Sequence, residues 1–413
     1  MYVKKNIFAI LVIFGVFFIL NYSSDPIIYG DSSRYLNFSL KDPPLYSFFI
    51  NSLKVIFNNL NSVVIVQTTF VGVAIIFFTK TLGDYFKLTI VMKILISLFL
   101  FIPILKFYRM ILTEPISYAF TLFFFNFALR LIYNFSLKNL FGLTFFAIAL
   151  LLTRNQFLYL YLVLFFFYQG IIILYRSKKI FIYLLTSILT IFFIHNSILK
   201  LSLSLKKSSL NTESSYKNEK NKYGLFYYTY IDAIYISNDN DIKTIKNEKM
   251  KTLLLNIFQE MNNKKALKAH YNGRGHYGLS FNEIRFYSDP LIEELAFRQK
   301  LDINEVQKKI TFTLIKKNFT RYIKHIFKKF YDATWLFVLL PLIMLFVSFF
   351  SFIKQKDKIS LFTFFLSIFT VGNHSTVYLL GRIQPRYLIY SDIILLMFVG
   401  LILFIFLEKK STN

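Results

Sequence analysis

Three acidic residues lie beside long apolar segments of this sequence, where a carboxylate can take part in chemistry. Asp31 follows the first apolar segment, Asp42 stands in the same connection, and Glu114 directly precedes a later apolar segment. A carboxylate within hydrogen-bond reach of an acceptor hydroxyl can act as a general base. Ionisable groups near membrane depth are costly and tend to mark functional sites, so these three acids are candidate site residues.

Arginines provide the complementary charge. The guanidinium group is a planar fork that binds phosphate and carboxylate groups better than a lysine ammonium does. Four arginines lie just outside apolar segments and are candidates to bind an anionic ligand, with Arg386 as the first choice: Arg109, Arg154, Arg382 and Arg386. Three tyrosines lie close in sequence to these charged residues and are further candidate binding residues: Tyr35, Tyr46 and Tyr387.

Each candidate also has an ordinary structural interpretation. Asp31 lies in a Gly-Asp-Ser-Ser sequence that is typical of a turn, and Asp42 precedes a proline, where turn geometry alone explains an acid. Glu114 precedes a proline at a helix start, where a carboxylate satisfies free amides and complements the helix dipole. Arg109 and Arg154 can extend to the polar surface of a bilayer or pair with a neighbouring acid.

Metal binding has little support in the sequence. The chain contains no Cys, and His270 and His276 have neither helical nor strand spacing nor a nearby acid to complete a ligand set. We therefore predict no metal ligands and no certain cofactor, while a divalent metal at the acidic residues stays open.

The chain is too apolar for a soluble globular protein. Of its 413 residues, 55% are hydrophobic and only 17% are charged. Soluble proteins average about 25% charged residues. The 48 Lys and Arg against 22 Asp and Glu would suit a nucleic-acid partner, but the long apolar segments argue against one. We predict an all-α polytopic membrane protein whose main partner is the lipid bilayer.

Ten apolar segments bounded by charged residues predict ten transmembrane helices. They are residues 7–21, 62–79, 94–108, 116–133, 139–153, 157–175, 180–198, 334–353, 359–380 and 387–407. The first segment lacks a small-residue cleavage site, so we expect a retained helix and not a removed signal peptide. An even number of spans places both termini on the same side of the membrane.

Basic residues outside residues 200–332 predict the orientation. Fifteen of them lie on the side that holds both termini, and eight lie on the other side. Cytoplasmic loops carry an excess of Lys and Arg, which predicts cytoplasmic termini, a protein of the cytoplasmic (inner) membrane and candidate site residues on its periplasmic face. Five of the eight outer residues are Arg, although the chain has 37 Lys and 11 Arg. This enrichment favours an anionic ligand at the outer boundary.

Three regions follow from this topology. Residues 1–199 form an N-terminal transmembrane domain with a first outer loop at 22–61, residues 200–332 form an outer soluble, mostly helical segment, and residues 333–413 form C-terminal transmembrane helices. Within the outer segment, apolar residues at helical spacing predict a helix that starts near residue 289 and continues to the next span.

Four stretches resemble motifs of one enzyme superfamily. They are Tyr29-Gly30-Asp31-Ser32-Ser33-Arg34-Tyr35 with Lys41-Asp42-Pro43-Pro44-Leu45-Tyr46, then Leu112-Thr113-Glu114-Pro115, Leu152-Thr153-Arg154-Asn155-Gln156 and Gln384-Pro385-Arg386-Tyr387-Leu388. In this order they resemble the GT-C superfamily of integral-membrane glycosyltransferases, in particular its protein O-mannosyltransferase-like and lipid A aminoarabinose transferase-like branch. The resemblance extends from residue 29 to residue 388.

The resemblance implies an inverting glycosyltransferase. Such an enzyme takes a sugar from a polyprenyl-phosphate donor at the outer face of the membrane and passes it to a hydroxyl of a lipid, glycan or protein acceptor. By resemblance, Asp31 is the general base of an active site that faces the periplasm, and the other acids named above bind the substrate. The four arginines are then candidates to bind the departing polyprenyl phosphate, and the three tyrosines to stack against the sugar or to orient the phosphate.

Two other functions remain as alternatives. An O-antigen polymerase or ligase also combines many spans with a large outer loop and arginines that face a polyprenyl-linked glycan. The acid-rich first outer loop with Pro43 and Pro44 favours a GT-C transferase over it. A transporter or flippase of a lipid-linked sugar would carry polar groups and broken helices in the middle of the bilayer, and the apolar segments here have almost no charge there.

Overall fold

Helices make up the computed structural model, which describes residues 2–29, 31–38, 42–208, 226–263, 276–298, 302–380 and 388–411. Within these ranges every named element is a helix, and the one β interaction is an isolated parallel bridge between Ile27 and Met110. The described residues therefore agree with the prediction of an all-α membrane protein. Among the described residues, five helical segments are long and apolar enough to cross a membrane: Asn61–Phe86, Ile90–Phe107, Glu114–Tyr133, Asn155–Tyr175 and Lys178–Leu205.

The chain divides into two compact units. The first consists of Met1–Lys206, Leu340–Asn373 and Arg386–Asn413, and the second of Lys207–Leu339 and His374–Pro385. The helices with residues in the first unit are α1 (Tyr2–Tyr22), α2 (Ser32–Leu36), α3 (Pro44–Phe57), α4 (Asn61–Phe86), α5 (Ile90–Phe107), α6 (Glu114–Tyr133), α7 (Leu137–Thr153), η1 (Asn155–Tyr159), α8 (Leu160–Tyr175), α9 (Lys178–Ser208), α16 (Phe319–Gln355), α17 (Lys358–Leu380) and α18 (Ile389–Ser411).

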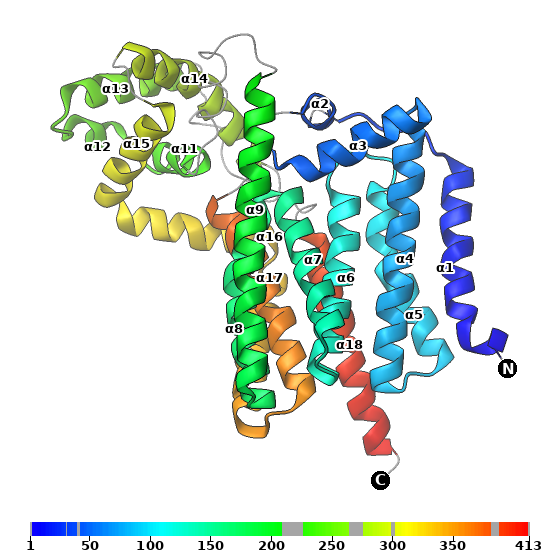
Figure 1. Cartoon of the computed structure of the whole chain (residues 1–413). Coiled ribbons are helices and arrows are strands. Elements are labelled where there is room, and N and C mark those ends of the chain that lie inside the picture. Colours follow the sequence, from blue (N-terminus) through cyan, green and yellow to red (C-terminus); the bar gives the residue numbers. More distant parts are fainter. Residues whose placement is uncertain are drawn as a thin grey trace. The chain divides into compact units, whose positions relative to one another are not determined.

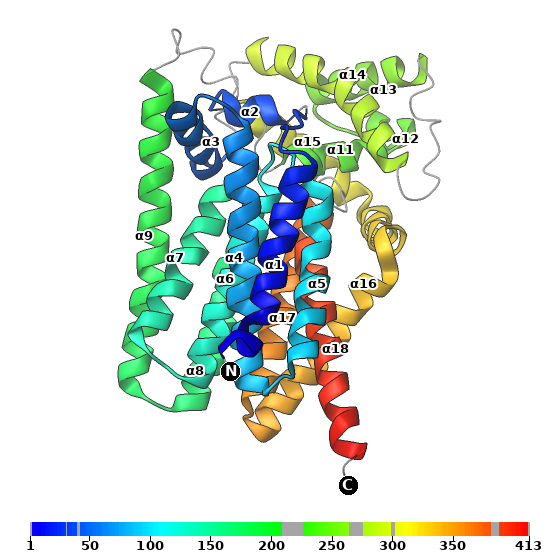
Figure 2. The same cartoon turned by 90° about the vertical axis from the view of Figure 1, so that its right-hand side faces the viewer.

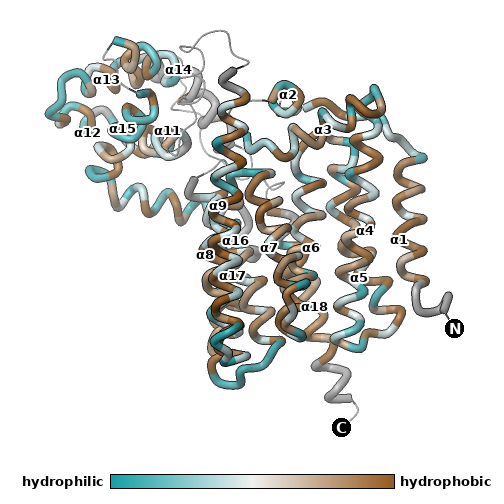
Figure 3. The backbone as a smooth tube through the Cα atoms, in the orientation of Figure 1, coloured by the Kyte–Doolittle hydropathy of each residue, from teal (hydrophilic) through white to brown (hydrophobic). Residues whose placement is uncertain are grey.

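Each of the ten predicted spans overlaps a helix of this set. Some of these helices have shorter apolar stretches, such as Ile7–Tyr22, Leu137–Thr153 and Ser391–Ile405. The number of ten spans therefore stays a prediction, while several apolar helices suited to a membrane are present. Hydrophobic residues run along these helices, and hydrophilic residues gather where the chain turns (Figure 3).

The long helices of the first unit lie side by side, and two short ones lie across one end of them. In both views α1 and α4 to α9 run roughly parallel or antiparallel, whereas α2 and α3 cross the end of this group (Figures 1 and 2). The start of α1 and the end of α18 lie at the end of the helices opposite to α2 and α3 (Figures 1 and 2). This arrangement agrees with an even number of crossings. Which end faces the cytoplasm stays a prediction.

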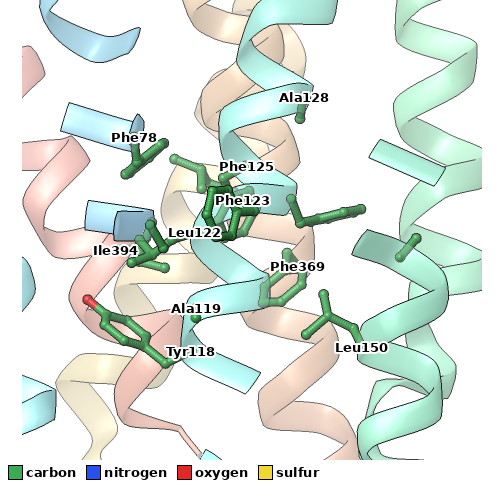
Figure 4. Close-up of a cluster of buried hydrophobic side chains, with 14 of the residues drawn as sticks. Phe78, Tyr118, Ala119, Leu122, Phe123, Phe125, Ala128, Leu150, Phe369 and Ile394 are labelled. Atoms are coloured by element: carbon green, nitrogen blue, oxygen red, sulfur yellow. The ribbon is translucent and has the colours of Figure 1, made fainter. Parts of the chain in front are cut away.

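Helix α6 is the centre of the core of the first unit. In its most apolar window 78% of the residues are buried, against 22% for α9. Phe125 of α6 contacts Phe369 of α17 with ring centroids 4.8 Å apart. Phe78 of α4, Leu150 of α7 and Ile394 of α18 belong to the same buried cluster (Figure 4). The position of α6 matters for function because its first residue is Glu114.

A glycine allows α7 to approach α6 closely. A Cβ atom on Gly142 of α7 would lie 2.5 Å from two ring carbons of Phe127 of α6. We expect Gly142→Ala to lower the free energy of unfolding by about 1–3 kcal/mol, since the added methyl group overpacks the contact. Gly400→Ala in α18 is the matched control, because a Cβ there meets nothing within 4 Å. Unfolding curves in detergent micelles measure both changes, and equal effects would contradict the close contact.

The second unit has a hydrophobic core of its own. Its helices include α11 (Tyr227–Tyr235), α12 (Asp239–Lys243), α13 (Glu248–Asn263), α14 (His276–Arg298), α15 (Ile303–Lys317) and the first part of α16. Apolar side chains of α11 to α15 form a buried cluster. The helix predicted from about residue 289 begins earlier, at His276, and is interrupted: Asp302 caps a new helix by accepting a hydrogen bond from the Asn304 amide at 2.8 Å.

A buried ion pair joins α11 to α16 within the second unit. Lys329 Nζ lies 2.8 Å from Asp232 Oδ2, and both side chains are only 1% exposed. His325 Nε2 lies 3.4 Å from the other carboxylate oxygen. Burial alone would raise the pKa of Asp232, but the Lys329 ammonium and the hydrogen bond with His325 outweigh it and hold that pKa below its ordinary value. The carboxylate is therefore kept charged inside the unit.

Candidate functional site

The connection that carries Asp31 is fixed to the segment in front of α6. The Ile27 amide donates to the Arg109 carbonyl oxygen at 2.8 Å, and the Ile111 amide donates to the Ile27 carbonyl oxygen at 3.2 Å. These two hydrogen bonds form the parallel bridge between the two connections. They bring residues that are distant in the sequence to the same end of the helices.

Ser32 strengthens this attachment. Its Oγ accepts a hydrogen bond from the Tyr29 amide at 2.8 Å and donates to the Ile111 carbonyl oxygen at 2.9 Å. The side chain is fully buried. Because Ser32 follows Asp31 directly and Ile111 lies three residues before Glu114, the two acids are held at one end of the first unit.

Gln67 of α4 forms hydrogen bonds both with α3 and with the connection before α6. Its Nε2 donates to the carbonyl oxygens of Tyr108 and Met110 at 2.7 and 3.1 Å, and its Oε1 accepts from the Tyr46 hydroxyl at 3.3 Å. Gln67 and Tyr46 are both fully buried. Buried polar groups normally need such partners, so this amide fixes α3, α4 and the connection before α6 against one another.

Arg34 bridges the two aspartates of the first connection. Its Nη1 lies 3.3 Å from Asp31 Oδ1, and its Nε donates to Asp42 Oδ2 at 2.9 Å. Nη2 also donates to Asp42 Oδ1, which makes the Arg34–Asp42 pair bidentate. Asp31 is 36% exposed and Asp42 is 12% exposed. Of the two acids, Asp31 is thus the one that a molecule from solution reaches more easily.

A second ion pair lies deeper. Arg154 Nη1 is 3.3 Å from Glu114 Oε1, and these side chains are 13% and 3% exposed. Glu114 is the first residue of α6, and Arg154 directly follows the last residue of α7. The two antiparallel helices therefore present an acid and a base to each other at the same end.

Tyr35 connects the two ion pairs. Its ring makes an edge contact with Tyr46, with centroids 5.1 Å apart. Burial raises the pKa of Tyr35, and the charged groups that act on its phenol come from both pairs: Arg154, Asp42, Glu114 and Arg34. Tyr35 therefore stays neutral and keeps a hydroxyl that can donate a hydrogen bond between the two pairs.

The surroundings of Asp42 make it a stronger base than an ordinary aspartate. Burial raises the pKa of Asp42, while Arg34 and Arg154 oppose the shift. A carboxylate with a raised pKa takes up a proton more readily at neutral pH than an ordinary one. Asp31 is the more exposed of the two acids, and both can act on an acceptor hydroxyl.

Gln156 links this end of α7 and η1 to α17 and α18. Its Nε2 donates to Asn373 Oδ1, and Asn373 Nδ2 donates to Ser391 Oγ at 2.9 Å. Ser391 Oγ in turn donates to the Leu388 carbonyl oxygen at 2.9 Å. The stretch that contains Arg154 is thereby joined to the start of the last helix.

The structure brings together six of the ten residues predicted from the sequence. These are Asp31, Tyr35, Asp42, Tyr46, Glu114 and Arg154. Arg109 is bound elsewhere, since its Nε donates to the backbone carbonyl oxygen of Asp25 at 2.9 Å. The predictions for Arg382, Arg386 and Tyr387 fall outside the described residues.

Two contributors were not singled out by the sequence. Arg34 was counted only as one of the basic residues of the outer face, although its position three residues after Asp31 is the spacing at which helical side chains meet. Gln67 lies in the middle of an apolar segment, and no local pattern distinguishes it. Its role depends on backbone carbonyl groups that only the fold brings near.

A metal centre has no visible ligand set in the described part of the chain. Within those residues no group of three or more His, Cys, Asp or Glu side chains is arranged to hold a metal ion. His270, one of the two histidines considered from the sequence, lies outside them. The arrangement that is present, with three carboxylates, two guanidinium groups and a neutral phenol, suits proton transfer and the binding of an anionic group.

Comparisons with protein-family models, with curated proteins and with solved structures find no match to this chain.

Proposed function

We propose that this chain is an inverting membrane glycosyltransferase that moves a sugar from a polyprenyl-phosphate donor to an acceptor hydroxyl. The reaction would take place at the periplasmic face of the cytoplasmic membrane. The observation that carries the proposal is the convergence of Asp31, Asp42 and Glu114 with Arg34 and Arg154 at one end of apolar helices. These residues come from three separate connections, and local sequence gives no reason for the three connections to meet.

Asp31 is the proposed general base. The acceptor hydroxyl attacks the anomeric carbon, its proton passes to the Asp31 carboxylate, and the bond from that carbon to the phosphate oxygen breaks. The partial exposure of Asp31 supports this role because the acceptor must reach it. Arg34, held by Asp42 on its other side, fixes the position of the Asp31 carboxylate.

The leaving polyprenyl phosphate needs cationic donors where its negative charge collects. Arg154 is the described arginine best placed for this, since it lies at the end of an apolar helix and acts electrostatically on Tyr35 and Asp42. From the sequence alone we propose that Arg386, which lies in one of the motif stretches, and Arg382, which lies just outside an apolar segment, bind the same phosphate. The polyprenyl tail would lie among the apolar helices.

One observation favours a transporter or flippase of a lipid-linked sugar as a second candidate. Asn126 lies fully buried in α6, and neither its Nδ2 nor its Oδ1 has a hydrogen-bond partner in the described part of the chain. A buried amide without partners is costly and is typical of positions where a polar substrate passes. The carboxylate cluster at the helix ends is not needed for transport, so we place this candidate second.

The assay that separates the two uses purified protein and a set of polyprenyl-phosphate sugars. We expect the amount of one lipid-linked sugar to fall when an acceptor is present, and free polyprenyl phosphate to appear in equal amount. Movement of the intact lipid-linked sugar across a vesicle membrane without its consumption would instead support transport. Consumption of a polyprenyl-linked glycan but of no single sugar would support an O-antigen polymerase or ligase.

The proposed orientation has its own test. A reporter enzyme that is active only outside the cytoplasm, fused at Asn240, should be active, while the same reporter after Lys410 should be silent. The expectation rests on the excess of basic residues on the side of the termini. The reverse pattern would place the carboxylate cluster in the cytoplasm and would remove the proposed periplasmic reaction.

A further inference from the structure

A second polar site lies at the other end of α6 from Glu114. Arg130 is in the last turn of this helix, which places it about 24 Å from Glu114 along the axis at 1.5 Å per residue. A cavity of about 400 Å³ lies there between the ends of α4 and α6 and the start of α7. The residues that line it include Lys80, Thr81, Asp84, Arg130, Ser136 and Asn139.

Arg130 is held in this cavity by a neutral group. Its Nε and Nη2 both donate to Thr81 Oγ1, at 3.1 and 3.0 Å, and Thr81 is only 2% exposed. Neither Arg130 nor Lys80 forms an ion pair with any residue in the part of the chain that the structure describes. A half-buried guanidinium without a carboxylate partner keeps much of its charge available for an external anion.

The start of α7 adds to the positive potential of the cavity. Ser136 caps this helix by accepting a hydrogen bond from the Asn139 amide at 3.2 Å, and Asn139 Nδ2 donates to the Asn134 carbonyl oxygen at 3.0 Å. The first amides of a 17-residue helix therefore lie at the cavity. Helix starts of this kind, next to an arginine, favour phosphate groups.

We propose that this cavity binds a phosphate group, with Arg130 as the principal contact and Lys80 at the exposed edge. The two cations outnumber the single acid of the lining, Asp84. The phosphate could belong to the headgroup of an anionic lipid, since the cavity lies at the ends of apolar helices, or to a phosphate ester free in solution. This inference is independent of the proposed glycosyl transfer, which concerns the opposite end of α6.

The test measures binding of two probes to the purified full-length protein in a neutral, phosphate-free detergent. The probes are dioctanoyl phosphatidic acid and inorganic phosphate, each titrated by calorimetry. We expect at least one of them to bind, and Arg130→Gln to weaken that binding on the order of tenfold to a hundredfold through loss of charge-assisted hydrogen bonds. If neither probe binds to the unaltered protein, the proposal is wrong.

Lys138→Gln provides the matched control. Lys138 is an exposed residue in the first turn of α7 that does not line the cavity, and this change removes the same unit of charge. We expect it to alter the affinity by less than about threefold, because exposed charges are strongly screened. Equal losses in Arg130→Gln and Lys138→Gln would show only general attraction to a basic surface and would overturn the site.

Asp84→Asn tests the sign of the ligand charge without touching Arg130. Removal of this carboxylate from the lining should strengthen binding of the phosphate probe severalfold. Weaker binding of the phosphate probe would contradict the proposal, because a phosphate bound in this cavity should be repelled by the Asp84 carboxylate. Displacement of the lipid probe by inorganic phosphate assigns the site to free phosphate esters, and binding of the lipid probe that phosphate does not displace assigns it to a lipid headgroup.

Discussion

Asp31→Asn should lower the rate of sugar transfer by a factor on the order of 10² to 10⁴, which is the usual loss when a general base is removed. Asparagine keeps the shape of the side chain and can accept a hydrogen bond, but it cannot take up the proton of the acceptor. Donor binding should survive because the phosphate and the polyprenyl tail are bound by other groups. Transfer and donor binding are measured separately on the purified protein.

Asp25→Asn is the matched control for this experiment. Asp25 is an exposed acid in the same connection, and only its backbone carbonyl oxygen contacts Arg109. We expect full activity in this variant. Asp42→Asn completes the comparison: an active Asp31→Asn with an inactive Asp42→Asn would make Asp42 the base, and two active variants would exclude this connection from the chemistry.

Arg154→Met should lower the free energy of unfolding by about 3–5 kcal/mol, because it removes the cation that lies 3.3 Å from the buried Glu114 carboxylate. Glu114 is 3% exposed, so water cannot replace the lost partner. Unfolding in mixed detergent micelles measures the loss. The double variant Glu114→Gln with Arg154→Met should recover most of the stability, since no buried charge is then left.

Arg298→Met is the control for this second prediction. Arg298 forms an ion pair with Glu294 four residues earlier in α14, but both side chains are at least half exposed. Loss of such a surface pair costs less than about 1 kcal/mol. A loss in Arg154→Met as small as that would show that the Glu114–Arg154 pair contributes little to the stability of the first unit.

Hydrophobic runs and charge were sufficient to predict the helical class and the approximate positions of the long helices. Each predicted span overlaps a helix. A single apolar segment in a lipid bilayer can satisfy its backbone hydrogen bonds internally only as a helix. The break between α14 and α15 was not predicted, since the apolar spacing continues through it and Asp302 shows its role as a cap only when the helix start is known. A capping residue between two periodic stretches is a weak signal in the sequence.

The candidate site was predictable in composition but not in geometry. Asp31, Glu114 and Arg154 stood out because each lies at the end of an apolar segment. Arg34 binds two aspartates because of the direction in which its side chain points. Gln67 joins three elements through hydrogen bonds to residues 21 to 43 positions away in the chain. Such contacts follow from packing and leave no periodic trace in the sequence.

The attachment of Ser32 to Ile111 also sets an order of assembly. The two residues are 79 positions apart, so at a synthesis rate of about 5–20 residues per second the serine waits roughly 4–16 seconds for its partner. During that interval α1, α4 and α5 can enter the bilayer, but the connection that carries Asp31 has nothing to hold it. A nascent chain halted before Ile111 would therefore contain three long helices and no assembled site.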